Sequence, residues 1–414
     1  MKEIPIAKPS LGAAEAKAAS EVVLSGWVTQ GPRVKAFEDA FAVAVGARHA
    51  CAVSSGTVAL HLGLLAVGVR PGDVVITVSH SFIATANAVR YCQAEPVFVE
   101  IDAATLNMDP AALHAMLERD FERKDGALWY RHTERLAQGE SPLAGRRPPL
   151  GRLGAILLVH QVGMPADLAR ILPLARAAGA PVVEDAACAI GSEFSPDGGR
   201  TWQRIGRPHA GLACFSFHPR KVLTTGDGGM LTTNDPAIDA KLRLLRHHGM
   251  SVSDLARHQA ADVVFEEYET TGFNYRLTDI QAAVGAEQLR RLAELVAERR
   301  RLAGAYHERL GSSRSVTRPQ APAYARSNWQ SYIVRLKPGV EQRAVMQALK
   351  VRGIQSRRGV MCAHLEAPYR SAWPRGCLPQ SEAAHERMIV LPLFPGMSIE
   401  DIARVVDALH DACV

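Results

Sequence analysis

Residues 212–221 read Leu-Ala-Cys-Phe-Ser-Phe-His-Pro-Arg-Lys, an apolar, β-prone run that ends in a lysine. The glycine-rich turn Gly226-Asp227-Gly228-Gly229 follows, and then a second apolar run at 230–233. We predict a strand at 212–217 and another at 230–233, with Lys221 enclosed by backbone between them. Burial removes water from an ammonium and favours the neutral amine, which can attack an aldehyde. Lys221 is therefore a candidate Schiff-base lysine, and the alternative is a surface lysine in a basic loop.

The regions around this stretch alternate between short β-rich runs and helical patterns. The predicted strands lie at 50–53, 74–78, 96–101, 156–160 and 181–184, and the predicted helices at 57–66, 83–91, 110–117 and 166–178. Such alternation is typical of an α/β fold, in which helices flank a mostly parallel sheet. Ligands of these sheets bind beyond the carboxyl ends of the strands. We therefore expect the residues that directly follow the strands to converge on one crevice.

From about residue 278 the pattern changes, which indicates a second unit. One long amphipathic helix is predicted over 279–310, followed by a strand at 329–336 and helices at 342–352 and 399–413. We predict a large domain over residues 1–280 and a smaller C-terminal α+β domain over 281–414. Two stretches within the large domain, 119–154 and 195–208, have the charge, proline and glycine content of surface insertions.

Composition and charge exclude several classes of protein. The 414 residues are 47% hydrophobic and 22% charged, as in ordinary globular proteins. No apolar run is long enough for a membrane span, and the N-terminus lacks the apolar core of a signal peptide, so we expect a cytoplasmic protein without a membrane partner. The net charge of +6 comes with no nucleic-acid-binding motif and also suits a small anionic substrate. The seven cysteines form no C-x-x-C pair, so neither a metal site nor a disulfide framework is predicted.

Three further segments carry candidate functional residues. Ser54-Ser55-Gly56-Thr57 lies between a strand and a helix, where backbone N–H groups and hydroxyls suit a phosphate, although a serine there also serves as a helix cap. Asp185 ends an apolar strand, where a carboxylate is costly unless it meets a cation such as a protonated pyridine nitrogen; the alternative is a helix cap. Phe82 follows the strand at 74–78 and could stack on a flat ring or serve as core.

The order of these segments resembles the DegT/StrS-type sugar aminotransferases, which are fold-type I enzymes dependent on pyridoxal 5′-phosphate (PLP). The matching motifs run over the whole chain: Ser25-Gly26-Trp27-Val28-Thr29-Gln30-Gly31-Pro32, Ser55-Gly56-Thr57, Pro71-Gly72-Asp73, Glu184-Asp185-Ala186-Ala187, Ser216 to Lys221, Gly226 to Gly229, Gly272-Phe273-Asn274-Tyr275-Arg276 and Leu391-Pro392. The resemblance implies a mostly parallel seven-stranded sheet flanked by helices in the large domain.

The resemblance also implies roles for single residues. Lys221 forms the internal aldimine and moves the proton, and Asp185 pairs with the pyridinium nitrogen. Phe82 stacks on the ring, and Ser55, Gly56, Thr57 and Ser216 hold the phosphate. Asn274 reaches the phosphate in the partner subunit, which implies a homodimer with shared active sites. The expected substrates are glutamate or glutamine as amino donor and a keto sugar, mostly nucleotide-linked, as acceptor.

Three segments depart from the family pattern and bear on the substrate class. Cys188 stands where glutamine or histidine usually approaches the cofactor's phenolic oxygen, His80 replaces an aromatic residue, and Gln161-Val162-Gly163-Met164 replaces the more common segment. Arg357, Arg358 and Trp27 are further candidates for the acceptor side. Alternative functions are another PLP reaction on this fold, namely an aminocyclitol-type aminotransferase or a lyase, and a non-catalytic PLP-binding protein. A dinucleotide-binding enzyme is disfavoured because the first strand–turn–helix unit lacks G-x-G-x-x-G.

Overall fold

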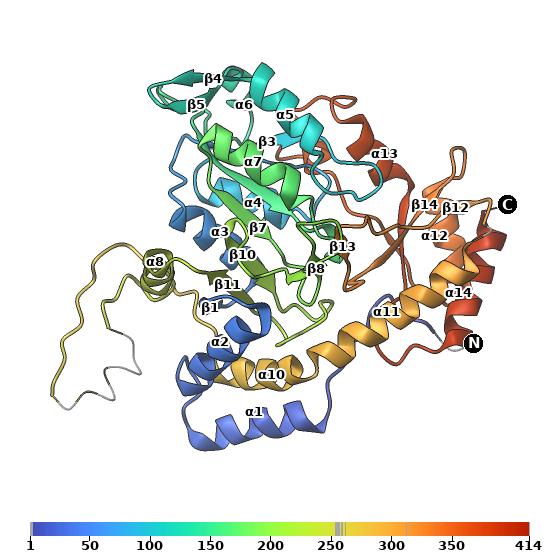
Figure 1. The fold of residues 1–414 in the computed structure, drawn as a ribbon, viewed down its shortest axis with the longest axis horizontal. Helices are drawn as coiled ribbons and strands as arrows, with labels where there is room; N and C mark the ends of the chain where they lie inside the picture. The colour runs from blue at the N-terminus through green and yellow to red at the C-terminus, as the bar shows by residue number, and fades with distance from the viewer. Residues whose placement is uncertain (1–2, 253–256, 258–259, 261, 312, 414) are drawn as a thin grey trace.

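The computed structural model describes residues 3–252, 257, 260, 262–311 and 313–413. Its centre is a seven-stranded sheet with helices on both faces (Figure 1). The strand order is β1 (His49–Val53), β11 (Gly229–Thr233), β10 (Gly211–Ser216), β7 (Val182–Asp185), β6 (Leu153–Val159), β2 (Val74–Val78) and β3 (Glu95–Val99). Only β11 runs antiparallel to its neighbours, which confirms the predicted mostly parallel sheet.

Alternate residues of the strands point to opposite faces, and each face packs against its own helices. Leu212 and Cys214 of β10 lie in one apolar cluster with α3 (Gly56–Ala66), α4 (Ala84–Tyr91) and α8 (Pro236–Arg246). Ala213 and Phe215 lie in the other cluster, with α2 (Pro32–Val45), α5 (Pro110–Arg119) and α7 (Leu168–Ala178). These central strands are apolar on both faces because neither face meets water.

A further apolar core lies in the C-terminal part of the chain. It is built around a four-stranded sheet of order β12 (Val316–Thr317), β14 (Tyr332–Leu336), β16 (Met388–Leu391) and β15 (Arg357–Arg358). The helices α11 (Leu292–Arg309), α12 (Gln342–Val351) and α14 (Ile399–Ala412) contribute to this core, and so does Ile4 from the N-terminal segment. Among the helices that the structure describes, none combines the length and apolar character that crossing a bilayer requires.

Two predictions of local structure were wrong. The single helix expected over 279–310 is two helices, α10 (Asp279–Arg290) and α11, that meet at Arg291. Arg291 binds Glu15 of α1 (Ala13–Ser25), so a contact from the far N-terminus accompanies the break. The stretch 119–154 is not confined to the surface. It forms the hairpin β4 (Phe121–Lys124) and β5 (Ala127–Tyr130) and the short helix α6 (Thr133–Leu136), and its apolar side chains enter the main core.

The remaining elements are short. The strands β13 (Ala325–Arg326), β8 (Glu193–Phe194) and β9 (Gln203–Arg204) form a small sheet that joins residues 193–204 to the C-terminal part. The helix α13 (Pro379–Arg387) follows the loop after β15, and its last turn leads into β16. The carboxyl ends of β1, β2, β6, β7 and β10 therefore share one edge of the main sheet, since β1 and β10 both run antiparallel to β11.

Candidate active site

A cavity of about 560 Å³ lies at the carboxyl edge of the main sheet. The residues that follow the strands line it, as expected for this type of sheet. Eight of the predicted site residues face this one cavity: Ser55, Gly56, Thr57, Phe82, Asp185, Cys188, Ser216 and Lys221. Asn274 does not line it; this residue is exposed, and it forms an isolated β-bridge with His247.

The start of α3 forms a close-fitting turn against β10. Ser55 caps the helix, and its hydroxyl accepts a hydrogen bond of 3.2 Å from the amide of Val58. A side chain at position 56 is excluded, because a Cβ there would lie 2.6 Å from the Cβ of Ser216. The close approach leaves the first amides of α3, together with the hydroxyls of Thr57 and Ser216, beside the cavity, which is a suitable place for a phosphate.

Asp185 is a buried carboxylate at the end of β7. Its Oδ2 accepts a hydrogen bond of 2.8 Å from the hydroxyl of Thr85, and its Oδ1 accepts one of 3.1 Å from the amide of Ala187. Burial raises the pKa of Asp185, and the bond from Thr85, the amide of Ala187 and the charge of Lys221 oppose the rise only in part. A cation inside the cavity would favour the ionised carboxylate.

Lys221 lies in the turn that follows β10, where its amide donates to the carbonyl of His218. Its Nζ is 2.9 Å from the Sγ of Cys188, and both residues are half-buried. The lysine is thus less enclosed than predicted, but its amine faces the cavity that Asp185 also lines. Cys188 therefore lies beside the lysine amine, at the position predicted to approach the cofactor.

Phe82 and His80, which both follow β2, have different environments. Phe82 lines the cavity and is 54% exposed, so one side of its ring is available for stacking. His80 is fully buried, and neither ring nitrogen has a hydrogen-bond partner within the described part of the chain. Burial, helped by His385, Arg335 and Arg358, lowers the pKa of His80 to about 3. A neutral imidazole therefore packs at a position that is aromatic in the family pattern.

Several residues of the cavity were not predicted. Thr85 lies in the first turn of α4, three residues after Phe82. His160 follows β6, and its Nε2 lies 2.9 Å from the Oε2 of Glu184. Gln330, which donates to the carbonyl of Arg220, comes from a distant segment that gave no signal. The structure brings Arg357 and Arg358 to the cavity but not Trp27.

Comparison with known proteins shows the family to which the chain belongs. The model of the DegT/DnrJ/EryC1/StrS aminotransferase family matches residues 9–410. The aminotransferase TlmJ from Streptoalloteichus hindustanus is 32% identical over 99% of both chains, with a TM-score of 0.81. DesV from S. venezuelae, solved in complex with a ketimine intermediate, is 30% identical over 99% of this chain and 98% of its own, with a TM-score of 0.82. DesI, solved in the presence of its TDP-sugar product, is 26% identical over 100% of this chain and 93% of its own, with a TM-score of 0.81.

The fold and the matching relatives define a PLP-dependent aminotransferase. The chain belongs to the DegT/DnrJ/EryC1/StrS family of sugar aminotransferases. The residues present fit the cofactor. The glycine at position 56 leaves room and donors for a phosphate beside Ser216. Burial raises the pKa of Asp185 despite the charge of Lys221, and a pyridinium nitrogen would supply a cation that favours the ionised carboxylate.

Proposed function

We propose that this protein transfers an amino group from glutamate or glutamine to a nucleotide-linked keto sugar, with Lys221 as the catalytic residue. One observation carries the proposal: the amine of Lys221, the carboxylate of Asp185 and the Gly56 turn face the same cavity. In this proposal Lys221 holds PLP covalently, Asp185 pairs with its ring nitrogen, Phe82 stacks on the ring, and the start of α3 with Ser216 binds the phosphate.

The residues of the chain then act as follows. PLP, when bound, supplies an aldehyde for the amine and a ring that stabilises negative charge on the carbon that loses a proton. The amine of Lys221, once released, would take the proton from the donor's α-carbon and pass it, within the same half of the reaction, to the carbon that was the aldehyde of PLP. In the second half it would move a proton in the opposite direction, to the acceptor's carbon. Asp185 stays ionised beside the ring nitrogen, and the bonds from Thr85 and Ala187 hold its orientation. Cys188 positions the lysine amine through the 2.9 Å contact.

The acceptor side of the cavity supports an anionic sugar substrate. Arg357 and Arg358 line the cavity from the strand β15, and the diphosphate of a nucleotide sugar is a suitable partner for guanidinium groups. DesI, a relative of similar fold, has a TDP-sugar product. We infer that the two arginines bind the diphosphate of the acceptor.

The assignment of Lys221 is tested with Lys221→Ala. We expect loss of cofactor absorbance characteristic of the covalent link, and a fall in transfer rate of roughly 10²-fold or more, because proton transfer by a positioned side chain contributes about 10²–10⁴-fold. Lys17→Ala, at an exposed position of α1, is the matched control and should leave both unchanged. Normal turnover by purified Lys221→Ala would refute the role of this lysine.

The amino donor and the reaction class are tested by the first half of the reaction. The holoenzyme is incubated with glutamate or glutamine without acceptor, and the corresponding keto acid and the aminated cofactor are measured. An aminotransferase forms both in equal amounts. A lyase, the second candidate, would leave the donor's amino group in place. An aminocyclitol-type enzyme would also form both products in this half of the reaction. In the second half, however, it would accept a cyclitol ketone in place of a nucleotide sugar.

A further inference from the structure

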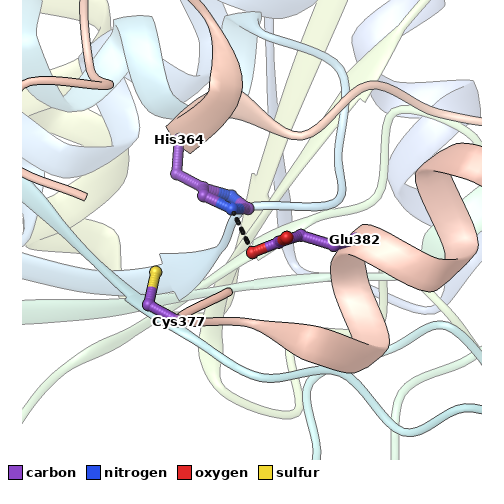
Figure 2. Close-up of side chains that lie close together, drawn as sticks. All are labelled: His364, Cys377 and Glu382. Atoms are coloured by element: carbon purple, nitrogen blue, oxygen red, sulfur yellow. Dashed lines mark hydrogen bonds and ion pairs between the residues drawn. The ribbon is translucent and has the colours of Figure 1, made fainter. Parts of the chain in front are cut away.

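A cluster of three side chains outside the cofactor cavity has the composition of a metal site. His364 lies in the short 3₁₀ helix Ala363–Leu365, Cys377 lies in the loop before α13, and Glu382 lies in the first turns of α13. Their nitrogen, sulfur and oxygen atoms all lie within 4.8 Å of one another. Figure 2 shows the imidazole edge facing the carboxylate, with the thiol pointing toward the same space. None of the three lines the cofactor cavity.

The ligand types and their spacing match zinc. Imidazole, thiolate and carboxylate are its usual ligands, at bond lengths of about 2.0–2.3 Å. Two ligands of one tetrahedral zinc ion therefore lie about 3.3–3.8 Å apart. The present cluster would have to contract by about 1 Å to reach this geometry, and Cys377 is at the surface, where its loop can make the movement. The surface position also gives the ion a path of entry.

Hydrogen bonds orient two of the three ligands in advance. The Nδ1 of His364 lies 2.6 Å from the hydroxyl of Ser79, so Nε2 faces the carboxylate of Glu382 at 3.1 Å. A histidine whose second ring nitrogen is held by a polar partner is the usual arrangement around a metal ion. The Oε1 of Glu382 also accepts a bond of 2.7 Å from the amide of Gly376, which fixes the loop that carries Cys377.

We propose that His364, Cys377 and Glu382 bind a structural zinc ion, with water as the fourth ligand. Binding is a ligand exchange without a change of oxidation state, in which the thiol of Cys377 loses its proton to solvent as the S–Zn bond forms. No sequence pattern indicates the site, because its ligands are 13 and 5 residues apart, outside any C-x-x-C spacing.

The position of the site indicates what the ion would do. Ser79, the partner of His364, immediately follows β2 and lies three residues before Phe82. The cavity-lining segment 356–361 lies just before the 3₁₀ helix that carries His364. A zinc ion at the cluster would therefore fasten the C-terminal wall of the cavity to the turn that carries Phe82. This role is independent of the chemistry proposed for Lys221.

The proposal is tested on the holoenzyme with Cys377→Ser, because this surface substitution removes one ligand without disturbing the core. Cys413→Ser, at a half-buried cysteine after α14, is the matched control. After dialysis against Zn²⁺ and then against buffer, the wild type and Cys413→Ser should each retain one zinc ion more than Cys377→Ser. Zinc should raise the melting temperature of the first two proteins but not of the third. Equal zinc content, or an equal shift in all three, would overturn the proposal.

Thiol protection gives an independent readout at the level of single residues. At a free Zn²⁺ concentration tenfold above the dissociation constant, alkylation of Cys377 should slow by about tenfold, because only the unoccupied fraction reacts. The rate at Cys413 should not change. Glu382→Gln should abolish the protection at Cys377 if the carboxylate is a ligand. An unchanged alkylation rate at Cys377 in the wild type would show that zinc does not bind there.

Discussion

At the scale of single residues, the surroundings of Asp185 disfavour the ionised form of its carboxyl group. Its carboxylate is buried, and burial raises its pKa despite the bonds from Thr85 and Ala187 and the nearby charge of Lys221. In the apoprotein the native state therefore holds this proton to a higher pH than the unfolded chain does. The stability of the apoprotein falls as pH rises from the ordinary carboxyl value through the raised one. A cation beside Asp185 would reverse this effect.

We therefore expect opposite effects of Asp185→Asn on the two forms of the protein. The variant apoprotein should melt at a higher temperature than the wild type at pH 8, and the difference should vanish below about pH 4, where both side chains are neutral. Its affinity for PLP should fall by about 10- to 100-fold, since a hydrogen-bonded charge contributes about 1.5–3 kcal/mol. Scanning calorimetry measures the melting temperature of each apoprotein, and titration with PLP measures its affinity for the cofactor. Asp39→Asn, on the surface of α2, should change neither, and an apoprotein of lower stability would contradict the argument.

At the scale of elements, Glu38 connects two helices to the edge of the main sheet. From α2 it accepts hydrogen bonds from Arg243 and Arg246 of α8 and from the amide of Ala52 in β1. Burial alone would raise the pKa of Glu38, but Arg246 and Arg243 outweigh it, and the pKa is lowered. The carboxylate therefore stabilises the fold above the ordinary glutamate value, and this contribution is lost as pH falls through the lowered one.

Glu38→Gln should destabilise the protein by about 3–5 kcal/mol at neutral pH, because it leaves a buried arginine without its counter-charge. The difference from the wild type should shrink in acid, where Glu38 itself becomes protonated. Thermal unfolding at neutral and acidic pH measures both effects. Glu118→Gln, at an exposed position of α5, should stay within about 0.5 kcal/mol of the wild type. A pH-independent loss in Glu38→Gln would indicate lost packing in place of lost charge.

The elements also show what sequence patterns can predict. Strand β2 was predicted to the residue, because an uninterrupted run of β-branched residues between turn residues admits few other structures. Lys221 and Asp185 could be predicted to lie at the sheet edge because Asp185 ends an apolar strand and Lys221 lies in the turn after one. The break at Arg291 and the contact of Gln330 with Arg220 depend on segments far apart in the chain. No local pattern encodes such contacts, and none encodes the juxtaposition of His364, Cys377 and Glu382.

At the scale of the whole molecule, the cavity of one chain lacks one of the residues predicted to bind the cofactor. Asn274 is exposed and lies outside the cavity, although the resemblance places it at a phosphate. Three large apolar side chains are exposed: Phe82 lies just before α4, Tyr91 is its last residue, and Tyr268 lies six residues before Asn274. Exposed apolar surface of this kind is typical of an interface between subunits. We infer a homodimer in which the partner's Asn274 completes each cofactor site.

This arrangement is tested by co-expressing two inactive variants with different tags and purifying the heterodimer. Asn274→Asp keeps the shape of the side chain but places a negative charge beside the phosphate, so it should inactivate the partner's site. The heterodimer of Lys221→Ala and Asn274→Asp should recover about half of the wild-type activity, because one of its two sites combines an intact Lys221 with an intact Asn274. The heterodimer of Lys221→Ala and Asp185→Ala is the control. Both residues face the same cavity of one chain, so each of its sites carries one defect and it should remain inactive. An inactive first heterodimer would refute the sharing of sites and leave the role of Lys221 intact.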